Sequence, residues 1–342
     1  MKAVVYSSKS FEKEYLAKAN HKKHDITLIS NPLGIDTASF SEGKDAVIVF
    51  TNDDVSAPVI EKLKKFGIKY IATRSVGTDH IDKEAASAAG IKIANVPNYS
   101  PQSIAEHAIA LILALNRKTI IAHQNAQIFD FRLDHLQGFT LYQKTVGLIG
   151  FGKIALCLAN ILNGFGCKVL IYDPYVNHIP ANVIKVSLDE LYQQSDIISL
   201  HTPLNTETKY TINNQSIKKM QDGVMLINTG RGALVNTKHL LNALKTGKIG
   251  FYGADVYENE KALFFEDHSK DVVKDELLQE LLTQPNVIIT PHQAFLTTEA
   301  LQEIANKTIK NLDMWQANKC VGDACACANS CRTEKAILKP NA

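Results

Sequence analysis

The sequence carries little net charge and no long hydrophobic run. Its 37 Lys and Arg residues nearly balance 35 Asp and Glu residues, which leaves a formal net charge of +2. So weak a field does not favour nucleic acid or an anionic membrane as a partner. The apolar runs are too short to span a bilayer, and the first residues, MKAVVYSS, lack the apolar core and cleavage site of a signal peptide. We therefore expect a cytoplasmic protein that binds neither membranes nor nucleic acid.

The chain also lacks array-type repeats and long low-complexity segments. What it has is an ordinary globular composition, with 45% hydrophobic and 21% charged residues. A length of 342 residues suffices for about two domains, each with its own core.

Short apolar runs alternate with helix-like segments through the first hundred residues. Amphipathic segments near 11–19, 57–66 and 82–89 separate runs typical of buried strands: KAVVYSS, ITLIS, DAVIVF, KYIATRS and IKIANVP. This alternation predicts a doubly wound parallel sheet.

Beyond two prolines at 97 and 101, the pattern changes. Residues 103–116, SIAEHAIALILALN, are apolar around much of a helix and predict a helix buried between domains or between subunits. Residues 124–143 show no clear period and predict an irregular or helical arm. The alternation of strands and helices resumes at residue 145 and continues to about 293, and a helix over 297–318 follows.

The predicted fold is α/β with two doubly wound parallel-sheet domains. A discontinuous, flavodoxin-like substrate domain (1–100 plus 296–342) would receive an inserted Rossmann dinucleotide domain (101–295), and residues 319–342 form a Cys-rich tail. Ligands of such sheets bind outside the carboxyl ends of the strands, so we expect the active site in the cleft between the domains.

The segment TVGLIGFGKIA (145–155) joins a predicted strand to a predicted helix through a glycine-rich turn. Gly150 permits the tight turn, Gly152 permits close approach of a pyrophosphate, and Ala155 permits the helix to pack on its strand. The next strand ends at Asp173, whose carboxylate can accept hydrogen bonds from a ribose diol. This order predicts a dinucleotide site, and the alternative is a chance glycine-rich turn. An acid at position 173 favours NAD over NADP because a 2′-phosphate would meet like charge.

Three polar side chains follow predicted strands of the second half. Arg231 follows GVMLINTG, Glu260 follows GFYGADVY, and His292 follows NVIITP. These types suit hydride transfer to a 2-oxo acid. A guanidinium can grip the carboxylate and polarise the carbonyl, an imidazole can exchange the proton, and a carboxylate can orient the imidazole and stabilise its protonated form. Taken singly, each residue has an ordinary alternative as a surface, turn or loop residue.

The chain resembles the D-2-hydroxyacid dehydrogenase family over about residues 1–318. The matching segments are RSVGTDHID (74–82), NVPNYSPQSIAEHA (95–108), VGLIGFGKIA (146–155), YDPY (172–175), INTGRGALV (227–235), ADVYENE (254–260) and TPHQAF (290–295). The resemblance implies that Arg231, Glu260 and His292 form the catalytic group.

The same resemblance implies contacts with ligands. Those with the substrate fall on the backbone of Val76 and Gly77 and on the side chains of Tyr99, Arg231 and Phe295. Those with the cofactor fall on Gly150, Gly152, Lys153, Ile154, Asp173, His201, Pro203, Thr229, Asp255 and His292. From the residues alone, the turn at 76–77 is equally an ordinary βα turn, and aromatic rings at a domain boundary are more often packing residues than ligand contacts. The alternative for Asp255 is a capping residue, and that for His201 is an ordinary strand-end histidine.

The implied activity is NAD-dependent hydride transfer, reversible between NADH and pyruvate, with D-lactate as the reduced product. Two alternatives stay open: a dehydrogenase for another D-2-hydroxy acid, such as 2-hydroxyisocaproate or glycerate, and a NAD(H)-sensing interaction protein like the corepressors that share this fold. The apolar helix 103–116 and the following arm resemble the family's dimer contact, so we expect a homodimer.

The Cys-rich tail departs from the family pattern. Cys320, Cys325, Cys327 and Cys331 lie within NKCVGDACACANSCR, and four thiolates so close in sequence can bind Zn or an iron–sulfur cluster. Their spacing matches no specific metal motif. A disulfide or redox-responsive cluster and an inert appendage are the alternatives.

Overall fold

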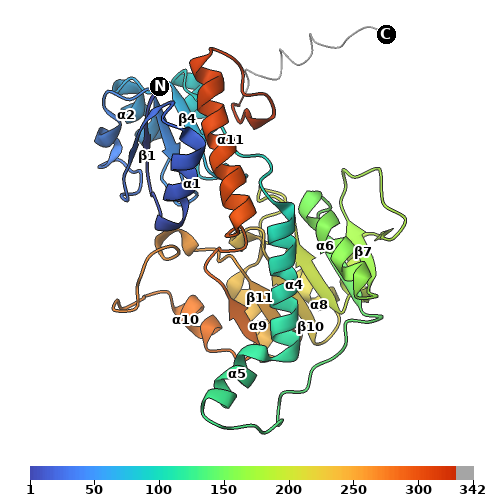
Figure 1. The fold of residues 1–342 in the computed structure, drawn as a ribbon. Helices are drawn as coiled ribbons and strands as arrows, with labels where there is room; N and C mark the ends of the chain where they lie inside the picture. The colour runs from blue at the N-terminus through green and yellow to red at the C-terminus, as the bar shows by residue number, and fades with distance from the viewer. Residues whose placement is uncertain (329–342) are drawn as a thin grey trace, which may run out of the picture. The chain divides into compact units, whose positions relative to one another are not determined.

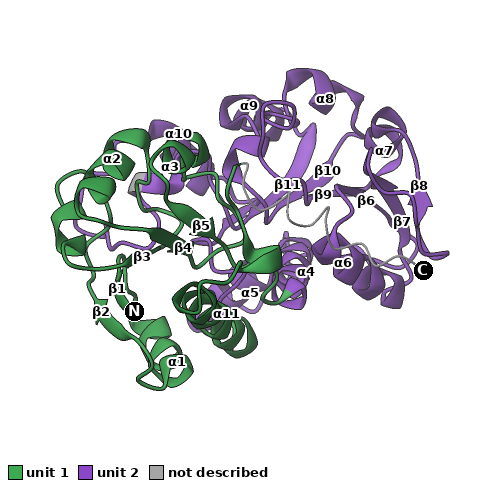
Figure 2. Cartoon of the chain, turned by 90° about the horizontal axis from the view of Figure 1, so that it is seen from above, with its two compact units in different colours: residues 1–100, 297–342 green, residues 101–296 purple. Residues whose placement is uncertain are grey.

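The computed structural model describes residues 1–328, which divide into two compact units (Figures 1 and 2). Unit 1 comprises Met1–Ser100 and the segment that begins at Thr297, and unit 2 comprises Pro101–Leu296. Unit 2 therefore ends at Leu296, whereas the sequence analysis placed the end of the inserted domain at residue 295. Within residues 1–328, no helix is both long and apolar enough to cross a membrane.

A five-stranded parallel sheet forms the centre of unit 1. Its strand order is β2-β1-β3-β4-β5, and the strands are β1 (Lys2–Val5), β2 (Asp25–Leu28), β3 (Ala46–Val49), β4 (Tyr70–Thr73) and β5 (Lys92–Ala94). Each coincides with one of the five apolar runs in the sequence. The central strand β3 is buried along its whole length, as expected for a parallel sheet covered on both faces.

Helices cover both faces of this sheet. The helices α2 (Ala57–Lys65) and α3 (Lys83–Ala88) pack on one face, and α1 (Ser10–Asn20) and α11 (Thr298–Gln316) lie side by side on the other (Figure 1). Ile309, Leu312 and Trp315 recur at spacings of three and bury one stripe of α11. The ring of Trp315 stacks on that of Tyr70 at 4.7 Å between centroids. This stripe ties the late helix to the amino-terminal sheet.

Unit 2 contains a seven-stranded parallel sheet with the order β12-β11-β10-β9-β6-β7-β8. The strands are β6 (Thr145–Ile149), β7 (Lys168–Tyr172), β8 (Ile184–Lys185), β9 (Ile197–Leu200), β10 (Val224–Asn228), β11 (Ile249–Ala254) and β12 (Val287–Ile289). The predicted class, two doubly wound parallel-sheet domains, is confirmed.

The helices of unit 2 also form two layers. One face is covered by the long helix α4 (Pro101–Arg117) and by α6 (Lys153–Gly164), which lie side by side (Figure 1). The other face is covered by α7 (Leu188–Gln194), α8 (Asn214–Lys219), α9 (Thr237–Lys245) and α10 (Glu276–Leu282). Short 3₁₀ turns, η1 (Ala38–Ser41), η2 (Gly232–Leu234), η3 (Glu260–Ala262) and η4 (Gly322–Ala324), occur in the connections of both units.

The arm expected over 124–143 begins as a helix. The helix α5 (Thr119–Gln127) buries no residue, and irregular chain leads from it to β6. Four apolar side chains of this segment are 72–84% exposed: Ile128, Phe129, Phe131 and Leu133. An apolar cluster so exposed is typical of a contact surface.

The strand order reverses beside β6, and this reversal places two loops side by side. Ile149 at the end of β6 pairs with Leu200 at the end of β9, so Gly150 and His201 leave the sheet together. Gly150 has a φ of +87°, and a Cβ there would lie 2.7 Å from the carbonyl oxygen of His201. Glycine is therefore required at position 150 by both backbone angle and close approach. Ligands of doubly wound sheets bind at such a switch point.

Candidate active site

Glu260 and His292 form a hydrogen-bonded pair in unit 2. Glu260 begins the turn η3 after β11, and His292 follows β12, the neighbouring strand. The Nδ1 atom of His292 lies 2.7 Å from Oε1 of Glu260, and each side chain is 18% exposed. The second carboxylate oxygen of Glu260 accepts the backbone N–H of Tyr257 at 2.9 Å. Both oxygens therefore have a donor, which fixes the orientation of the carboxylate.

The partner of Nδ1 determines which imidazole nitrogen can do chemistry. A carboxylate only accepts hydrogen bonds, so Nδ1 of His292 carries the proton and Nε2 is left to give or take another. His292 has a φ of +55°, in the left-handed region that residues other than glycine seldom occupy. Backbone strain of this kind costs about 1–3 kcal/mol and clusters at functional sites.

Arg231 lies on a loop that packs against the loop bearing Glu260. The next residue, Gly232, approaches the backbone of Tyr257 so closely that a Cβ would lie 2.0 Å from its carbonyl carbon. The side chain of Asn228, at the end of β10, donates to the carbonyl of Arg231 at 2.9 Å and shapes the turn. The order β12-β11-β10 therefore gathers His292, Glu260 and Arg231 at the carboxyl ends of three adjacent strands.

Glu258 and Glu260 stand two residues apart but do different things. Glu258 accepts the hydroxyl of Tyr210 at 2.8 Å and the backbone N–H of Thr237 at 2.9 Å. It thereby ties the β11 loop to α9. Of these two acids, only Glu260 contacts the imidazole of His292. The structure thus assigns different partners to two acids that are close together in the sequence.

The glycine-rich turn has the open surface that a pyrophosphate requires. A Cβ at Gly152 would meet no atom within 4 Å, and Gly152 supplies no side-chain cap to the first N–H groups of α6. Helix amides without a cap are well suited to phosphate oxygens. Asp173, just after β7, accepts the N–H of Phe151 at 2.8 Å and that of Tyr175 at 2.8 Å. Its carboxylate is thus held beside the turn. Lys153 and Ile154 form the first residues of α6.

Two further cofactor candidates lie at the ends of β9 and β10. Burial lowers the pKa of His201 to about 4, so its imidazole is neutral at neutral pH. Its Nε2 atom lies 2.9 Å from the hydroxyl of Ser199. The hydroxyl of Thr229 is buried and finds no hydrogen-bond partner among residues 1–328, which favours a ligand there. Pro203 is exposed on the loop after His201.

Asp255 is more enclosed than its predicted contact with the cofactor suggested. It is 1% exposed, and its carboxylate accepts the hydroxyl of Thr290 at 2.6 Å and the backbone N–H groups of Gln293 and Ala294 at 2.8 and 2.7 Å. These bonds fold the segment around His292 over the end of β11. The contact of Asp255 with a cofactor stays a prediction.

The turn after β4 carries the substrate candidates of unit 1. Arg74, 2% exposed, anchors the strand end through an ion pair of 2.9 Å with the carboxylate of Glu12. The side chain of Asn95 donates to the carbonyl of Val76 at 2.7 Å, which fixes the orientation of that peptide group and of the N–H of Gly77. Val76 is 45% exposed at the tip of this turn.

The aromatic substrate candidates divide between the units. Tyr99 is half-buried in unit 1, and Phe295 is buried in unit 2 directly after the residues that Asp255 holds. Their contact with a common substrate, and the cleft between the domains, stay predictions.

The described part of the Cys-rich tail pairs with unit 1 rather than forming a metal centre. Cys325 forms an antiparallel bridge with Ala94 at the edge of β5, and the Sγ atom of Cys327 accepts the backbone N–H of Ile93 at 3.2 Å. Cys320 is exposed. Residues 1–328 contain no group of three or more side chains able to hold a metal ion, so they give no support to Zn or an iron–sulfur cluster. Cys331 lies outside the described residues.

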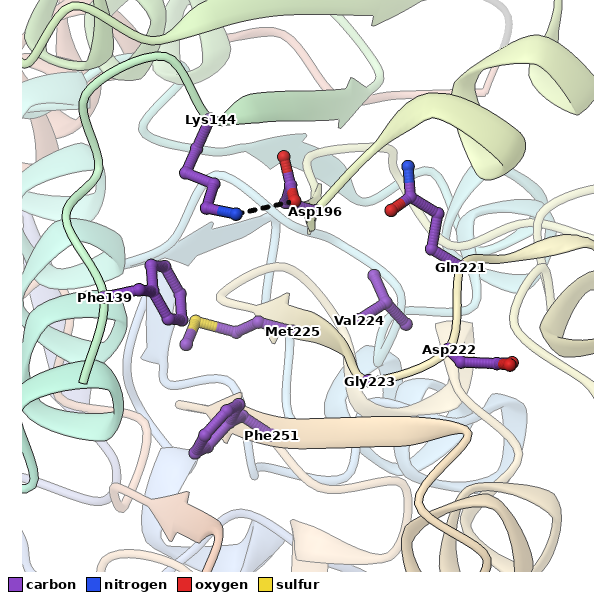
Figure 3. A pocket seen from close by; sticks show the side chains of 9 residues that line it. All are labelled: Phe139, Lys144, Asp196, Gln221, Asp222, Gly223, Val224, Met225 and Phe251. Atoms are coloured by element: carbon purple, nitrogen blue, oxygen red, sulfur yellow. Dashed lines mark hydrogen bonds and ion pairs between the residues drawn. The ribbon is translucent and has the colours of Figure 1, made fainter. Parts of the chain in front are cut away.

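A cavity of about 260 Å³ lies at the amino ends of the inner strands of the unit 2 sheet (Figure 3). Its polar side is the ion pair of Lys144 with Asp196, at 3.1 Å, and the side chain of Met225 points toward the ring of Phe139 (Figure 3). Lys144 and Asp196 precede β6 and β9, so this cavity opens at the amino ends of the strands. It is therefore separate from the candidate active site.

The sequence analysis missed His107, which lies close to the segment that carries His292. His107 reaches Thr290 and Asp255 from α4 with its Nε2 atom, at 2.9 and 3.4 Å. The available signal was a single histidine on a strongly apolar helix, and only the packing of α4 on β11 and β12 shows what it meets.

Comparison with known proteins identifies the family of the chain. The model of the "D-isomer specific 2-hydroxyacid dehydrogenase, NAD binding domain" matches residues 109–294. The D-lactate dehydrogenase of Escherichia coli K12 is 44% identical over 91% of this chain and 96% of its own. The solved structure of the pyruvate reductase of Chlamydomonas reinhardtii is 42% identical, covers 94% of this chain and 98% of its own, and has a TM-score of 0.88. That of the Aquifex aeolicus D-lactate dehydrogenase complexed with NAD and lactic acid is 33% identical, covers 92% and 96%, and has a TM-score of 0.84. The chain therefore belongs to the D-isomer specific 2-hydroxyacid dehydrogenase family.

Proposed function

We propose that this protein is an NAD-dependent D-lactate dehydrogenase that reduces pyruvate and catalyses the reverse reaction. The observation that carries the proposal is the contact of 2.7 Å between Nδ1 of His292 and the carboxylate of Glu260. These residues follow β12 and β11, and Arg231 follows the neighbouring strand β10. The D-lactate dehydrogenase and pyruvate reductase relatives, similar over nearly their whole length, support the choice of substrate.

Unit 2 would bind the cofactor. The open turn at Gly150 and Gly152 would receive the pyrophosphate, Asp173 the adenosine ribose, and the buried hydroxyl of Thr229 a polar group near the nicotinamide. The bound nicotinamide supplies the hydride in reduction and accepts it in oxidation. The match of this part of the chain to an NAD-binding domain supports the assignment.

The side chains of the site would handle the substrate and the proton. Arg231 grips the carboxylate of pyruvate in a fork and polarises the carbonyl at C2. His292 donates the proton on Nε2 to the developing alkoxide oxygen, and it recovers that proton in the oxidation of lactate. The carboxylate of Glu260 holds Nδ1 and stabilises the imidazolium form.

Unit 1 would complete the substrate site. The backbone N–H groups of Val76 and Gly77 bind the substrate carboxylate, as consecutive turn amides can. Tyr99 lines the pocket over the substrate, and Phe295 lies near its methyl group.

The test is a panel of 2-oxo acids assayed by NADH oxidation: pyruvate, 2-oxoisocaproate and hydroxypyruvate, each with NADPH as a cofactor control. We expect pyruvate to have the highest kcat/KM and NADPH to support little turnover. A higher kcat/KM for another acid would move the proposal to that substrate. Binding of NADH without turnover of any acid, in a folded protein, would contradict it and favour the sensing role.

We also propose that the protein works as a homodimer. The exposed apolar segment 128–133 supports this assembly, whereas the apolar face of α4 is already buried in the core of unit 2. Sedimentation at micromolar concentration is expected to give a dimer, and Phe131→Ser is expected to weaken it. A wild-type monomer under these conditions would contradict the proposal.

A further inference from the structure

A partly buried histidine outside the predicted site contacts the segment that carries His292. His107 lies on the face of α4 that packs against β11 and β12, and its side chain is 16% exposed. Its Nε2 atom is 2.9 Å from the hydroxyl oxygen of Thr290 and 3.4 Å from Oδ1 of Asp255. The contact joins a helix to the ends of two strands far away in sequence.

The direction of each hydrogen bond in this group follows from its chemistry. The hydroxyl of Thr290 has one proton, and its oxygen is 2.6 Å from the carboxylate of Asp255. A carboxylate only accepts, so the hydroxyl gives its proton to Asp255 and has only lone pairs left for His107. The Nε2 atom of His107 is therefore the donor. The result is a chain of donors that runs from His107 through Thr290 to Asp255.

The carboxylate at the end of this chain holds the backbone on either side of His292. It accepts the N–H groups of Gln293 and Ala294 at 2.8 and 2.7 Å. The N–H of His292 itself donates to the carbonyl of Thr290 at 2.9 Å, in the strained left-handed conformation. A strained backbone persists only where its surroundings over-determine it. The donor chain supplies such a constraint.

We propose that His107 is a positioning residue that acts through Thr290 and Asp255 to hold the 290–294 segment in the shape that keeps His292 on Glu260. The inference rests on the proposed function in one respect, because it takes His292 as the acid–base group. The carboxylate of Asp255 is in direct reach of His107, and that of Glu260 contacts the segment through His292.

Two matched pairs of variants test the proposal. His107→Gln keeps an N–H donor of similar reach, whereas His107→Leu fills the space without a donor. Thr290→Ser keeps the hydroxyl, whereas Thr290→Val removes it. We expect kcat with NADH and pyruvate to fall about tenfold in the Leu and Val variants, the loss of roughly one hydrogen bond to the site. The KM for NADH should change less than twofold, and the Gln and Ser variants should keep most of the activity.

The double variant His107→Leu/Thr290→Val tests whether the residues act as one chain. Because either change alone interrupts the chain, the double variant should be little worse than the single ones. Additive losses, or equal losses in His107→Gln and His107→Leu with a lower melting temperature in both, would overturn the proposal in favour of plain packing.

Hydrogen exchange gives a readout that does not need turnover. The backbone amides of Gln293 and Ala294 should exchange about tenfold faster in the Leu and Val variants than in the wild type, while those of β6 stay unchanged. Unchanged exchange at 293 and 294 would overturn the inference whatever the activity. An inactive wild-type enzyme whose exchange nevertheless responds would contradict the proposed function alone.

Discussion

Replacing Glu260 by Gln probes how much the contact with His292 contributes to catalysis. The carboxylate accepts two donors, Nδ1 of His292 at 2.7 Å and the N–H of Tyr257 at 2.9 Å. Gln has a single acceptor oxygen, so it can satisfy one of these donors and turns an NH₂ group toward the other. The substitution therefore removes the charge and also breaks one of the two hydrogen bonds.

The loss of the charge and the loss of one hydrogen bond together determine the expected decrease in kcat/KM. A hydrogen bond to a charged group contributes about 1.5–3 kcal/mol and a neutral one about 0.5–1.5 kcal/mol, so removal of the charge costs roughly 1–1.5 kcal/mol. Solvent screens the pair only partly, since each side chain is 18% exposed. With a second bond lost, the total is about 2–3 kcal/mol, or about 30- to 150-fold in kcat/KM.

The assay is steady-state reduction of pyruvate by NADH, with Glu258→Gln as the matched control. Glu258 is an acid of the same loop that bonds to Tyr210 and Thr237 instead of His292. Its variant should lose thermal stability but retain kcat/KM within about threefold. A Glu260→Gln enzyme that stays within threefold of wild type, or a Glu258→Gln enzyme with the larger loss, would refute the reasoning.

Three further changes follow from the same geometry. Arg231→Lys keeps the positive charge but loses the forked guanidinium, so kcat/KM for pyruvate should fall about 100-fold or more with little change in NADH affinity. Steady-state kinetics and a NADH titration measure the two quantities, and a loss of NADH affinity with kcat/KM retained would contradict this role. Gly150→Ala forces a side chain into a φ of +87° and against the carbonyl of His201, so we expect a loss of about 1–3 kcal/mol in the free energy of unfolding and weaker NADH binding, measured by urea denaturation and fluorescence. Burial lowers the pKa of His201 from 6.5 to about 4. Between these pH values the folded state binds fewer protons than the unfolded state. The free energy of unfolding should therefore decrease as the pH falls from about 6.5 to 4, by at most about 3 kcal/mol. Urea denaturation of His201→Asn across that range should show a flatter dependence on pH than the wild type, and parallel curves would contradict the assignment.

Local patterns in the sequence were enough to predict the two sheets and the dinucleotide turn. A buried parallel strand is a short apolar run, and a βα turn next to phosphate needs glycine, so both depend on neighbouring residues alone. The positions of Arg231, Glu260 and His292 after their strands could also be read, because each lies within a few residues of the end of its strand.

Contacts between distant segments depended on the tertiary structure. The sequence shows two acids in YENE, but the packing of the β11 loop sends Glu258 to Tyr210 and Glu260 to His292. It shows clustered cysteines, but the described part of the tail pairs Cys325 with the edge of β5. It shows His107 in an apolar helix, but only the position of α4 on the sheet brings that imidazole to Thr290. The physical reason is that strand order and helix packing set which side chains meet, whereas spacing along the chain sets only which element each side chain belongs to.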